Sequence, residues 1–502
     1  MKKIILDKNN LRYLDQFRNK KKIVLCHGVF DVLHYGHIAH LNQAKTFGDI
    51  LVVSITDDVF VNKGPDRPIF SSLIRAKTIL NLEAVDFVII SKFPNALGIL
   101  SQIKPHIYVK DKEYQSKDNI FFKNFILEKN FLKKINCKIK FTDQIKYSSS
   151  NLANLRFNNF DDQQTVYLNN IKKKYSVSYI DDIFYKIKKL KICLIGDPII
   201  DKYIFSSVEG IASKSPTLAS VYHGEENYAG GALAVASMLS SLGTNVNLIY
   251  YSDKNKLTKE IEKKLNKNIN LVSVNNKSNS FVPIIERIVN IPRYEKLHQM
   301  YHFKNFTHNK ISVDKFKNQV NKFYNKGDLM LVIDFGFNFL DANLIKFINN
   351  FNFSVNVHSN SINKNFNNAS KYKKSIYSTL NFSEYLSDRR LQIENNPNKI
   401  LDYIKKKEKK DNFSITLGKK GSIFKKKEKI IYCPSFFNYT KDTTGSGDAY
   451  FAITALLNKL NLEPDLIAFL GNIYAGLHAN IVGNKSFVSS EDLVKNIKIL
   501  LS

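Results

Sequence analysis

The sequence has no tryptophan, only four cysteines and no long hydrophobic run. The cysteines form no C-x-x-C pair, so neither a zinc site nor a disulfide framework is indicated, and we expect buried free thiols in a reducing compartment. Because no run of about 18 apolar residues occurs, a membrane-spanning helix is not expected. Residues 1–10 also lack the apolar stretch of a secretion signal. These absences predict a cytoplasmic protein without a membrane partner.

Negative charge is scarce: 45 acidic residues stand against 75 basic ones, which gives a formal net charge of +30. Only nine of the basic residues are arginine, and lysine is spread along the whole chain. Nucleic-acid surfaces favour arginine for bidentate contacts. We therefore expect no nucleic-acid partner, although a positive field would attract phosphorylated, anionic substrates.

Two segments begin alike, with a short apolar strand that runs into a glycine-containing turn: Lys22–Gly28 and Lys191–Asp197. Each opens a series of strands that alternate with helical patterns, which is typical of parallel α/β domains. The strands expected in the first series are residues 22–26, 50–55, 86–90, 107–109 and 137–141. The sequence thus predicts two α/β domains, 1–154 and 189–502, joined by a polar linker over 155–188.

The turn after the first strand reads HGVFDVLHYGH at positions 27–37. Free N–H groups and the dipole at a helix start favour a bound anion. His34 and His37, three residues apart, can face one triphosphate. Nucleotidyl transfer needs charge stabilisation at the α-phosphate as pyrophosphate leaves, and imidazoles can supply it. The alternative is a pair of ordinary loop histidines.

This pattern, GxFDxxHxGH, resembles the HIGH-type nucleotidyltransferase superfamily, particularly its cytidylyltransferase-like branch and the heptose-1-phosphate adenylyltransferases. The likeness extends over about residues 22–152 and includes Val61–Pro68, Leu82–Asp86 and Ile103–Lys110. It implies a Rossmann-like domain in which His34 and His37 stabilise the transition state. The nucleotide- and phosphate-binding residues that it implies are Gly28, Phe30, Asp31, Lys63, Arg67, Lys110, Ser148, Ser149 and Ser150.

One position departs from that family: Asp111 stands where a glycine usually follows the lysine. A carboxylate there could repel an anionic substrate, which puts the geometry around Lys110 in doubt.

A second glycine-containing turn, DTTGSGDA at positions 442–449, precedes an apolar helix. Small residues let consecutive N–H groups converge on an anion, and the helix adds its positive end. Asp448 is placed to accept the proton of a sugar hydroxyl as that oxygen attacks the γ-phosphate of ATP. The alternative is a plain glycine-rich helix entry.

This turn resembles the DTxGAGD signature of the ribokinase-like, or phosphofructokinase-B, sugar kinases, over roughly residues 190–490. The resemblance implies a ribokinase-like α/β domain with a small β-sheet lid, in which Asp448 is the catalytic base. Nucleotide and phosphate binding would fall to Gly418, Gly421, Thr444, Gly445, Ser446 and Gly447. Sugar binding would fall to Asp201, Gly230, Gly231 and Arg287. Glu384, with Asn381, would organise Mg²⁺ through water.

Residues 213–217, 286–299 and 363–367 are similar to the subgroup of kinases that serve ADP-heptose synthesis. We also expect lid strands at 217–222 and 281–290, and a homodimer that forms through the lid.

Together the resemblances predict a bifunctional sugar kinase and nucleotidyltransferase that makes a nucleotide-activated heptose for lipopolysaccharide or another surface polysaccharide. ATP would be the phosphate donor and ATP or CTP the nucleotidyl donor, and the partners would be sugar phosphates and nucleotides. In the familiar bifunctional heptose enzymes the kinase comes first, whereas here the order is reversed. Three alternatives remain open: an active kinase with a degenerate transferase domain, a cytidylyltransferase for another phosphorylated polyol, and a non-enzymatic basic binding protein.

Overall fold

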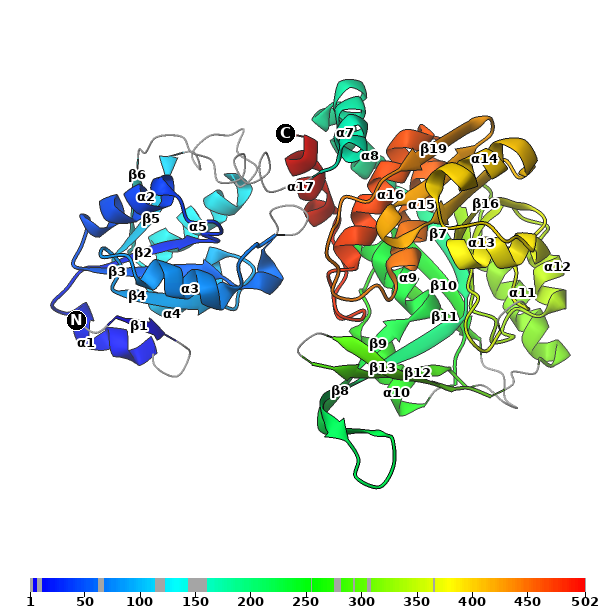
Figure 1. Cartoon of the computed structure of the whole chain (residues 1–502), viewed down its shortest axis with the longest axis horizontal. Coiled ribbons are helices and arrows are strands. Elements are labelled where there is room, and N and C mark those ends of the chain that lie inside the picture. The colour runs from blue at the N-terminus through cyan, green and yellow to red at the C-terminus, as the bar shows by residue number, and fades with distance from the viewer. Residues whose placement is uncertain are drawn as a thin grey trace. The chain divides into compact units, whose positions relative to one another are not determined.

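A computed structural model describes residues 3–6, 11–61, 67–112, 122–142, 160–253, 255–274, 281–291, 294–304, 308–363 and 366–501. Contacts between residues divide the chain into two compact units, Met1–Phe160 and Asp161–Ser502 (Figure 1). Each unit is described by itself.

The first unit is built on a six-stranded parallel sheet in the order β1-β4-β3-β2-β5-β6. The strands are β1 (Ile4–Leu6), β2 (Ile23–Gly28), β3 (Ile50–Thr56), β4 (Phe87–Ser91), β5 (Ile107–Asp111) and β6 (Lys138–Thr142). The helices are α1 (Asp15–Arg18), α2 (Tyr35–Lys45), α3 (Ser72–Leu80), α4 (Ala96–Ile103) and α5 (Phe122–Lys134). All seven residues of β3 are buried, as in a parallel sheet that is covered on both faces.

The strand order reverses at β2. From β2 the chain proceeds outward through β3 and β4 on one side and through β5 and β6 on the other. Ligands of such doubly wound sheets bind beyond the carboxyl ends of the strands at this reversal point. The turn after β2 therefore lies where the fold itself favours a ligand site.

The second unit contains a nine-stranded sheet in the order β11-β10-β7-β14-β15-β16-β17-β18-β19. Its strands are β7 (Lys191–Gly196), β10 (Asn245–Tyr251), β11 (Ile269–Val274), β14 (Leu329–Asp334), β15 (Phe353–Val357), β16 (Ser375–Asn381), β17 (Asn412–Thr416), β18 (Ser422–Lys426) and β19 (Lys429–Cys433). The ladders are parallel as far as β17, and β18 and β19 are antiparallel.

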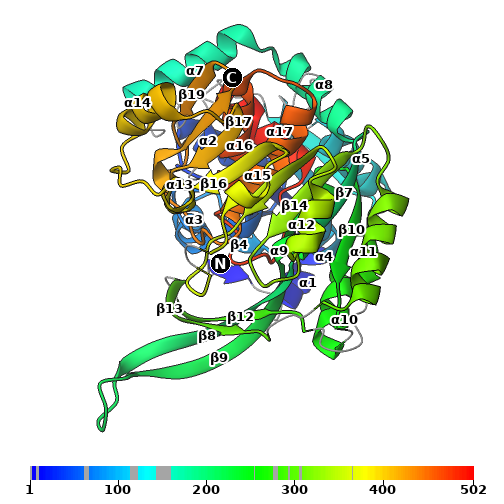
Figure 2. The ribbon, with the colours of Figure 1, turned by 90° about the vertical axis from the view of Figure 1, so that its right-hand side faces the viewer.

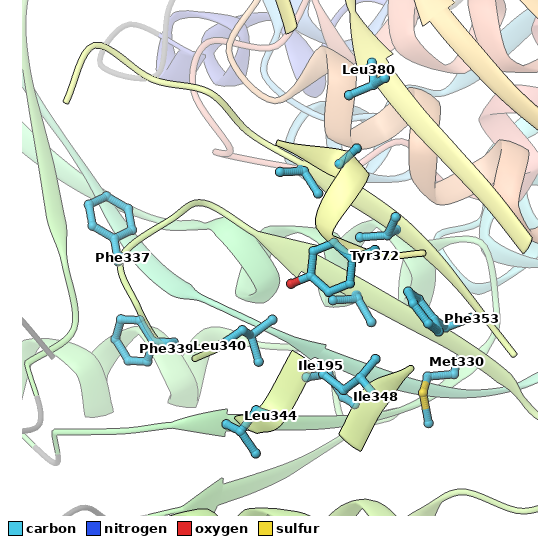
Figure 3. Close-up of a cluster of buried hydrophobic side chains, with 14 of the residues drawn as sticks. Ile195, Met330, Phe337, Phe339, Leu340, Leu344, Ile348, Phe353, Tyr372 and Leu380 are labelled. Carbon is cyan, nitrogen blue, oxygen red and sulfur yellow. The ribbon is translucent and has the colours of Figure 1, made fainter. Parts of the chain in front are cut away.

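Helices cover this sheet, and one large apolar core lies beneath them. They are α9 (Gly231–Ser241), α10 (Lys256–Lys264), α11 (Lys310–Phe323), α12 (Ala342–Ile348), α13 (Phe382–Arg389), α14 (Pro397–Lys407), α15 (Ser446–Lys459), α16 (Pro464–His478) and α17 (Ser490–Leu501). Figure 3 shows part of the core, where Met330 and Phe353 of adjacent strands pack near Leu344 and Ile348 of α12. The core fixes the strand ends that carry the polar groups described below.

A separate four-stranded sheet in the order β13-β12-β8-β9 forms the predicted lid. Its strands are β8 (Pro198–Ile211), β9 (Leu218–Gly230), β12 (Ile284–Asn290) and β13 (Glu295–His302). The β8–β9 hairpin projects away from the body of the unit (Figure 2). Its far end exposes Ile211 and Leu218, which are 73% and 58% exposed.

The expected linker extends into the second unit. Asp162–Lys174 (α7) begins with a capping box between Asp161 and Gln164. Val177–Ile187 (α8) buries an apolar stripe of four residues spaced for one helix face: Ile180, Ile183, Phe184 and Ile187. The hydroxyl of Tyr167 donates to the backbone oxygen of Asp465 at 2.7 Å. The second unit therefore starts at Asp161 rather than at residue 189, because an amphipathic stripe gains stability by packing.

All four cysteines, Cys26, Cys137, Cys193 and Cys433, are buried free thiols, as predicted. A search of the part of the chain that the structure describes finds no helix with the length and apolar character to cross a bilayer.

Candidate active sites

The turn after β2 has an unusual backbone. Phe30 and Val32 have φ angles of 49° and 53°, a region that side chains, and β-branched ones above all, seldom adopt. Such strain persists where the surroundings impose it and is concentrated at functional sites. A side chain at Gly28 would approach the Phe30 ring to 3.0 Å, so this turn is also closely packed.

The two histidines of the turn lie together at the start of α2. His34 is the N-cap residue, with an extended backbone, and α2 begins at Tyr35. The rings of His34 and His37 stack with centroids 3.9 Å apart, and the Phe30 ring meets His37 edge-on at 5.4 Å. Both imidazoles thus lie at the positive end of a helix, where an anion is favoured.

Asp31 and Arg67, two of the predicted phosphate ligands, are paired with each other. Arg67 Nε lies 2.7 Å from Asp31 Oδ2, and both side chains are almost fully buried. Asp31 also accepts the backbone N–H groups of Ile69 and Phe70. In this arrangement the pair holds residues 67–70 against the turn, and the phosphate-binding roles of both residues stay predictions.

Lys110 is likewise paired within the unit. Its Nζ lies 3.1 Å from Oε2 of Glu128 on α5, and both side chains are less than a tenth exposed. The hydroxyl of Tyr108 donates to the same carboxylate at 3.3 Å. Burial and, to a lesser extent, the positive charge of Lys110 lower the pKa of the nearby His27 to about 3. Glu128 therefore partly neutralises the lysine that was predicted to meet a phosphate.

Four predicted residues of this site, Lys63 and Ser148–Ser150, lie outside the described residues. Their roles stay predictions.

The second site is assembled at the carboxyl ends of β15 and β16 and at the start of α15. Gly445, the N-cap residue of α15, has a φ of 76°, which favours glycine. A side chain there would approach Asn484 Oδ1 to 2.9 Å. Ser446 opens the helix, and its Oγ donates to the oxygen of Thr443 at 2.7 Å. The small residues of the predicted phosphate turn thus stand at a helix N-terminus.

Asp448, in the first turn of α15, is held by two side chains from the end of β15. His358 Nε2 lies 2.8 Å from Asp448 Oδ1, and Asn356 Nδ2 lies 3.1 Å from the same oxygen. Asp448 is buried. The carboxylate predicted to be the base is therefore fixed by its neighbours.

His358 also approaches Glu384, with Nδ1 3.7 Å from Oε1. Burial alone would lower the pKa of His358, but Asp448 and then Glu384 and Asp334 raise it to about 9. The imidazole is consequently positively charged at neutral pH.

Asn381 and Glu384 were predicted to organise Mg²⁺, and their side chains form the capping box of α13. Asn381 Oδ1 accepts the N–H of Glu384 at 2.9 Å, and Glu384 Oε2 accepts the N–H of Asn381 at 2.7 Å. Oε1 of Glu384 accepts the Ser359 N–H at 3.1 Å. Across the described ranges, no cluster of three or more His, Cys, Asp or Glu is arranged for a metal. The role of this pair in organising Mg²⁺ through water stays a prediction.

The first residue of the phosphate turn connects it to the lid. Oδ1 of Asp442 lies 2.8 Å from Nζ of Lys296 on β13, which also contacts Oγ1 of Thr444. Oδ2 accepts the Tyr203 hydroxyl at 2.8 Å and the Gly483 N–H at 2.9 Å. Burial would raise the pKa of Asp442, but Lys296 and the backbone N–H groups of Thr444 and Gly483 hold it well below its usual value. Two lid strands thus meet at one carboxylate.

Asp201 and Arg287, both predicted to bind the sugar, form a buried ion pair. The pair joins β8 to β12 and leaves the proposed sugar contacts of both residues as predictions. Gly231 opens α9 with a φ of 55°, and a side chain there would approach the oxygen of Asp197 to 2.3 Å. A side chain at Gly230 would approach Oδ2 of Asp201 to 2.8 Å. The glycine pair therefore allows close packing behind the carboxylate.

The predicted nucleotide loop is the turn between β17 and β18. Gly418 and Gly421 both have positive φ angles, and the N–H of Leu417 donates to the oxygen of Gly421 at 2.8 Å.

Sequence reasoning missed His358, Asn356 and Lys296. The first two had a usable signal, because they are polar residues at the carboxyl end of the apolar run Phe353–Val357, where the residues of α/β sites gather. Lys296 lies in the segment 286–299, which was predicted to face the sugar, but nothing in the sequence marked this lysine among the many in the chain.

Comparison with protein families gives two matches. Residues 25–154 match the cytidylyltransferase-like family, and residues 373–477 match the pfkB family of carbohydrate kinases.

Among curated proteins, the bifunctional protein HldE of Nitratiruptor sp. is 40% identical over 106 residues, 21% of this chain and 23% of that protein. HldE of Campylobacter jejuni is 41% identical over 102 residues, 20% of this chain and 22% of that protein. These likenesses fall in the N-terminal domain, and the domain order differs from that of HldE. The chain thus aligns with less than a quarter of the length of these relatives.

Among solved structures, phosphofructokinase-2 from Escherichia coli in complex with potassium aligns with 62% of this chain and 99% of its own. The sequence identity is 15% and the TM-score 0.49. A ribokinase from Arabidopsis thaliana, complexed with ribose and ATP, covers the same share of this chain and 98% of its own, with 15% identity and a TM-score of 0.46.

The architecture is α/β in both units: a doubly wound parallel sheet in the first, and in the second a mainly parallel nine-stranded sheet with a separate four-stranded sheet. The chain therefore carries a cytidylyltransferase-like domain, matched over residues 25–154, followed by a domain that matches the pfkB family of carbohydrate kinases over residues 373–477. Together the two matches indicate a transferase.

Proposed function

We propose that the chain is a bifunctional enzyme that makes a nucleotide-activated heptose for a surface polysaccharide such as lipopolysaccharide. The kinase half transfers the γ-phosphoryl group of ATP to the anomeric hydroxyl of a sugar 7-phosphate. The transferase half joins a sugar 1-phosphate to the nucleotidyl group of ATP or CTP, and pyrophosphate leaves. A separate phosphatase acts between the two steps, and the cytoplasm supplies the substrates.

The observation that carries the kinase half is Asp448 at the start of α15, with its carboxylate held by His358 and Asn356. As the sugar oxygen attacks the γ-phosphorus, the carboxylate takes the hydroxyl proton and ADP leaves. The turn Thr443–Gly447 offers backbone N–H groups to the phosphoryl oxygens. Mg²⁺ is expected to accompany the triphosphate, with Glu384 and Asn381 organising it through water.

The transferase half is supported by the stacked pair His34 and His37 at the start of α2. Their N–H groups can stabilise the charge that develops at the α-phosphate. Similarity to proteins named bifunctional HldE, located in this half, agrees with the proposal.

The heptose assignment draws on the segments 213–217, 286–299 and 363–367, several of which are basic or amide-rich, as a site for an already phosphorylated sugar requires. Asn363 and Asn367 belong to segment 363–367, which was also predicted to face the sugar. Their side-chain amides instead donate hydrogen bonds within the unit, to the backbone oxygens of Phe335 and His358 respectively. We expect D-glycero-D-manno-heptose 7-phosphate, or a close seven-carbon analogue, to have a kcat/KM about 10²-fold above that of fructose or ribose.

A survey of products tests the proposal. The purified chain is incubated with candidate sugar phosphates and each nucleoside triphosphate, and products are read by mass spectrometry. A heptose bisphosphate and a nucleotide diphosphate sugar are the expected products. A better turnover of ribose or fructose 6-phosphate would overturn the heptose assignment alone, and the absence of any phosphorylated sugar would overturn the kinase proposal.

A second candidate keeps only the kinase active. It is favoured by the ion pair between Lys110 and Glu128, and by Asp111 beside it, because both reduce the positive charge available to a phosphate in the first unit. In the same survey, sugar phosphorylation without nucleotidyl transfer would support this candidate.

A further inference from the structure

The strongest unassigned feature is His358, a partly buried histidine between two carboxylates of the second unit, with its side chain 20% exposed. It follows β15, approaches Asp448 at 2.8 Å and Glu384 at 3.7 Å, and stacks on the Phe335 ring with centroids 4.0 Å apart. Neither the family comparison nor the motif analysis gives it a role.

Its position is fixed from several sides. The backbone N–H of His358 donates to the oxygen of Asp334 at 2.8 Å, and its own oxygen accepts the Asn367 amide at 3.0 Å. The stacked rings of Phe335 and His358 are inclined by only 11°. The backbone of His358 is thus held at both its N–H and its oxygen, and its ring is held by stacking, so the residue is a rigid support rather than a side chain that happens to touch Asp448.

Both side-chain contacts to Asp448 fall on the same oxygen. His358 Nε2 and Asn356 Nδ2 approach Oδ1, at 2.8 Å and 3.1 Å. An ionised carboxylate only accepts hydrogen bonds, so Nε2 of His358 must carry a proton in this contact. With Oδ1 occupied twice, Oδ2 is the oxygen left to face a substrate.

We infer that His358, assisted by Asn356, is the positioning residue that fixes Oδ1 of Asp448 and thereby presents Oδ2 as the atom that takes the sugar proton. The inference rests on the proposed kinase function. In the step, the sugar oxygen forms a bond to the γ-phosphorus and the bond from that phosphorus to the β,γ-bridging oxygen breaks. The hydroxyl proton passes to Oδ2, and ADP carries away the bridging oxygen.

The test compares replacements of His358 in the full chain. His358→Leu removes the donor, and misplacement of a catalytic group by about an ångström can cost about 10²-fold in rate. We expect kcat for sugar phosphorylation to fall by about 10- to 100-fold, with KM values for ATP and sugar phosphate within about threefold. His358→Gln places an amide N–H near the position of Nε2 and should restore most of kcat.

The decisive readout is the double variant. In Asp448→Asn the base is already lost, so adding His358→Leu should lower kcat little further, as for residues that act as one unit. A role in folding alone would lower both backgrounds equally. The matched control is His308→Gln, since His308 also lies against an aromatic ring, that of Tyr251, and contacts a backbone oxygen, that of Asn338.

A kcat for His358→Leu within about threefold of the unaltered chain would overturn the inference, and so would full losses in both backgrounds. If His358→Leu fails to fold, Asn356→Ala carries the test, with an expected kcat loss of about three- to tenfold that disappears in the Asp448→Asn background. Failure of the unaltered chain to phosphorylate any sugar would instead overturn the proposed function.

Discussion

The turns that precede α2 and α15 share a plan, a glycine-containing segment that ends at a helix N-terminus, but they differ in how their charges are arranged. Before α15, each acidic group meets a cation from another element: His358 reaches Asp448, and Lys296 reaches Asp442. Before α2, Asp31 likewise meets a cation, Arg67, but the two predicted catalytic histidines stack on each other. The nearby cation Lys110 is paired with Glu128 inside the unit.

The difference indicates that the two sites obtain their positive charge in different ways. The turn before α15 holds its carboxylates in prearranged pairs, so Asp448, the proposed base, is oriented before any substrate binds. The turn before α2 presents two imidazoles, the proposed stabilisers of the transition state, while the described cations near it are paired within the unit.

The largest effect is expected at Asp448. Asp448→Asn keeps the shape of the side chain but removes the proton acceptor, and general-base catalysis contributes about 10²–10⁴-fold. Steady-state assays should show kcat for sugar phosphorylation reduced by at least that order, with ATP affinity little changed. A variant that retains most of its kcat would remove Asp448 from the mechanism.

A change at Lys110 should act on stability. Lys110→Met leaves Glu128 buried without its partner, which typically costs about 3–5 kcal/mol. Urea unfolding of the full chain should show an earlier transition for the first unit, and the double variant Lys110→Met/Glu128→Leu should recover much of the loss.

The control is Lys92→Met, because the Lys92 side chain, which pairs with Asp57, is 62% exposed. An exposed pair contributes at most about 1 kcal/mol. Equal losses in Lys110→Met and Lys92→Met would contradict a structural role for the buried pair.

The lid should form a dimer. Ile211 and Leu218 are exposed at the end of the β8–β9 hairpin, and the outer edge of β9 is open to a further strand. Light scattering of the full chain at micromolar concentration should give a dimer, and Leu218→Asp should weaken it. A monomer in the unaltered chain would count against the lid as a dimer interface.

A pH-dependent effect is expected at Asp197, whose pKa is raised to about 8 by burial and by Asp334. The folded chain keeps a proton there that the unfolded chain loses above about pH 4. The free energy of unfolding therefore falls as pH rises from about 4 to about 8. Asp197→Asn should remove this pH dependence. The difference between the urea midpoint of the variant and that of the unaltered chain should therefore be more positive at pH 8 than at pH 5. An equal gain at both pH values would contradict the assignment.

Features formed by residues adjacent in the chain could be predicted from the sequence, whereas contacts between distant residues could not. The turns at 27–37 and 442–449 were found because strand, glycine turn and helix start are adjacent in the chain. The contact between His358 and Asp448 could not be found this way, since it forms only when the ends of β15 and α15 meet across 90 residues.

The ion-pair partners of charged residues could not be predicted from the sequence either. Nothing near Lys110 in the sequence identifies Glu128 as its partner, so the lysine was predicted to meet a phosphate. The strand β1, with three residues, is too short to show alternation, and it is held by pairing with β4. Residues 161–188, predicted as a linker, are grouped with the second unit by their contacts, and the apolar stripe of α8 within this polar segment is the signal for that packing.

The most direct test of two independent sites is to assay both reactions in one preparation of His37→Ala. Removing a charge-stabilising group from a transferase site is expected to lower pyrophosphate release by about 10²-fold or more. The account predicts that ATP-dependent sugar phosphorylation by the same protein stays near that of the unaltered chain. Loss of both activities in a variant that remains folded would contradict it.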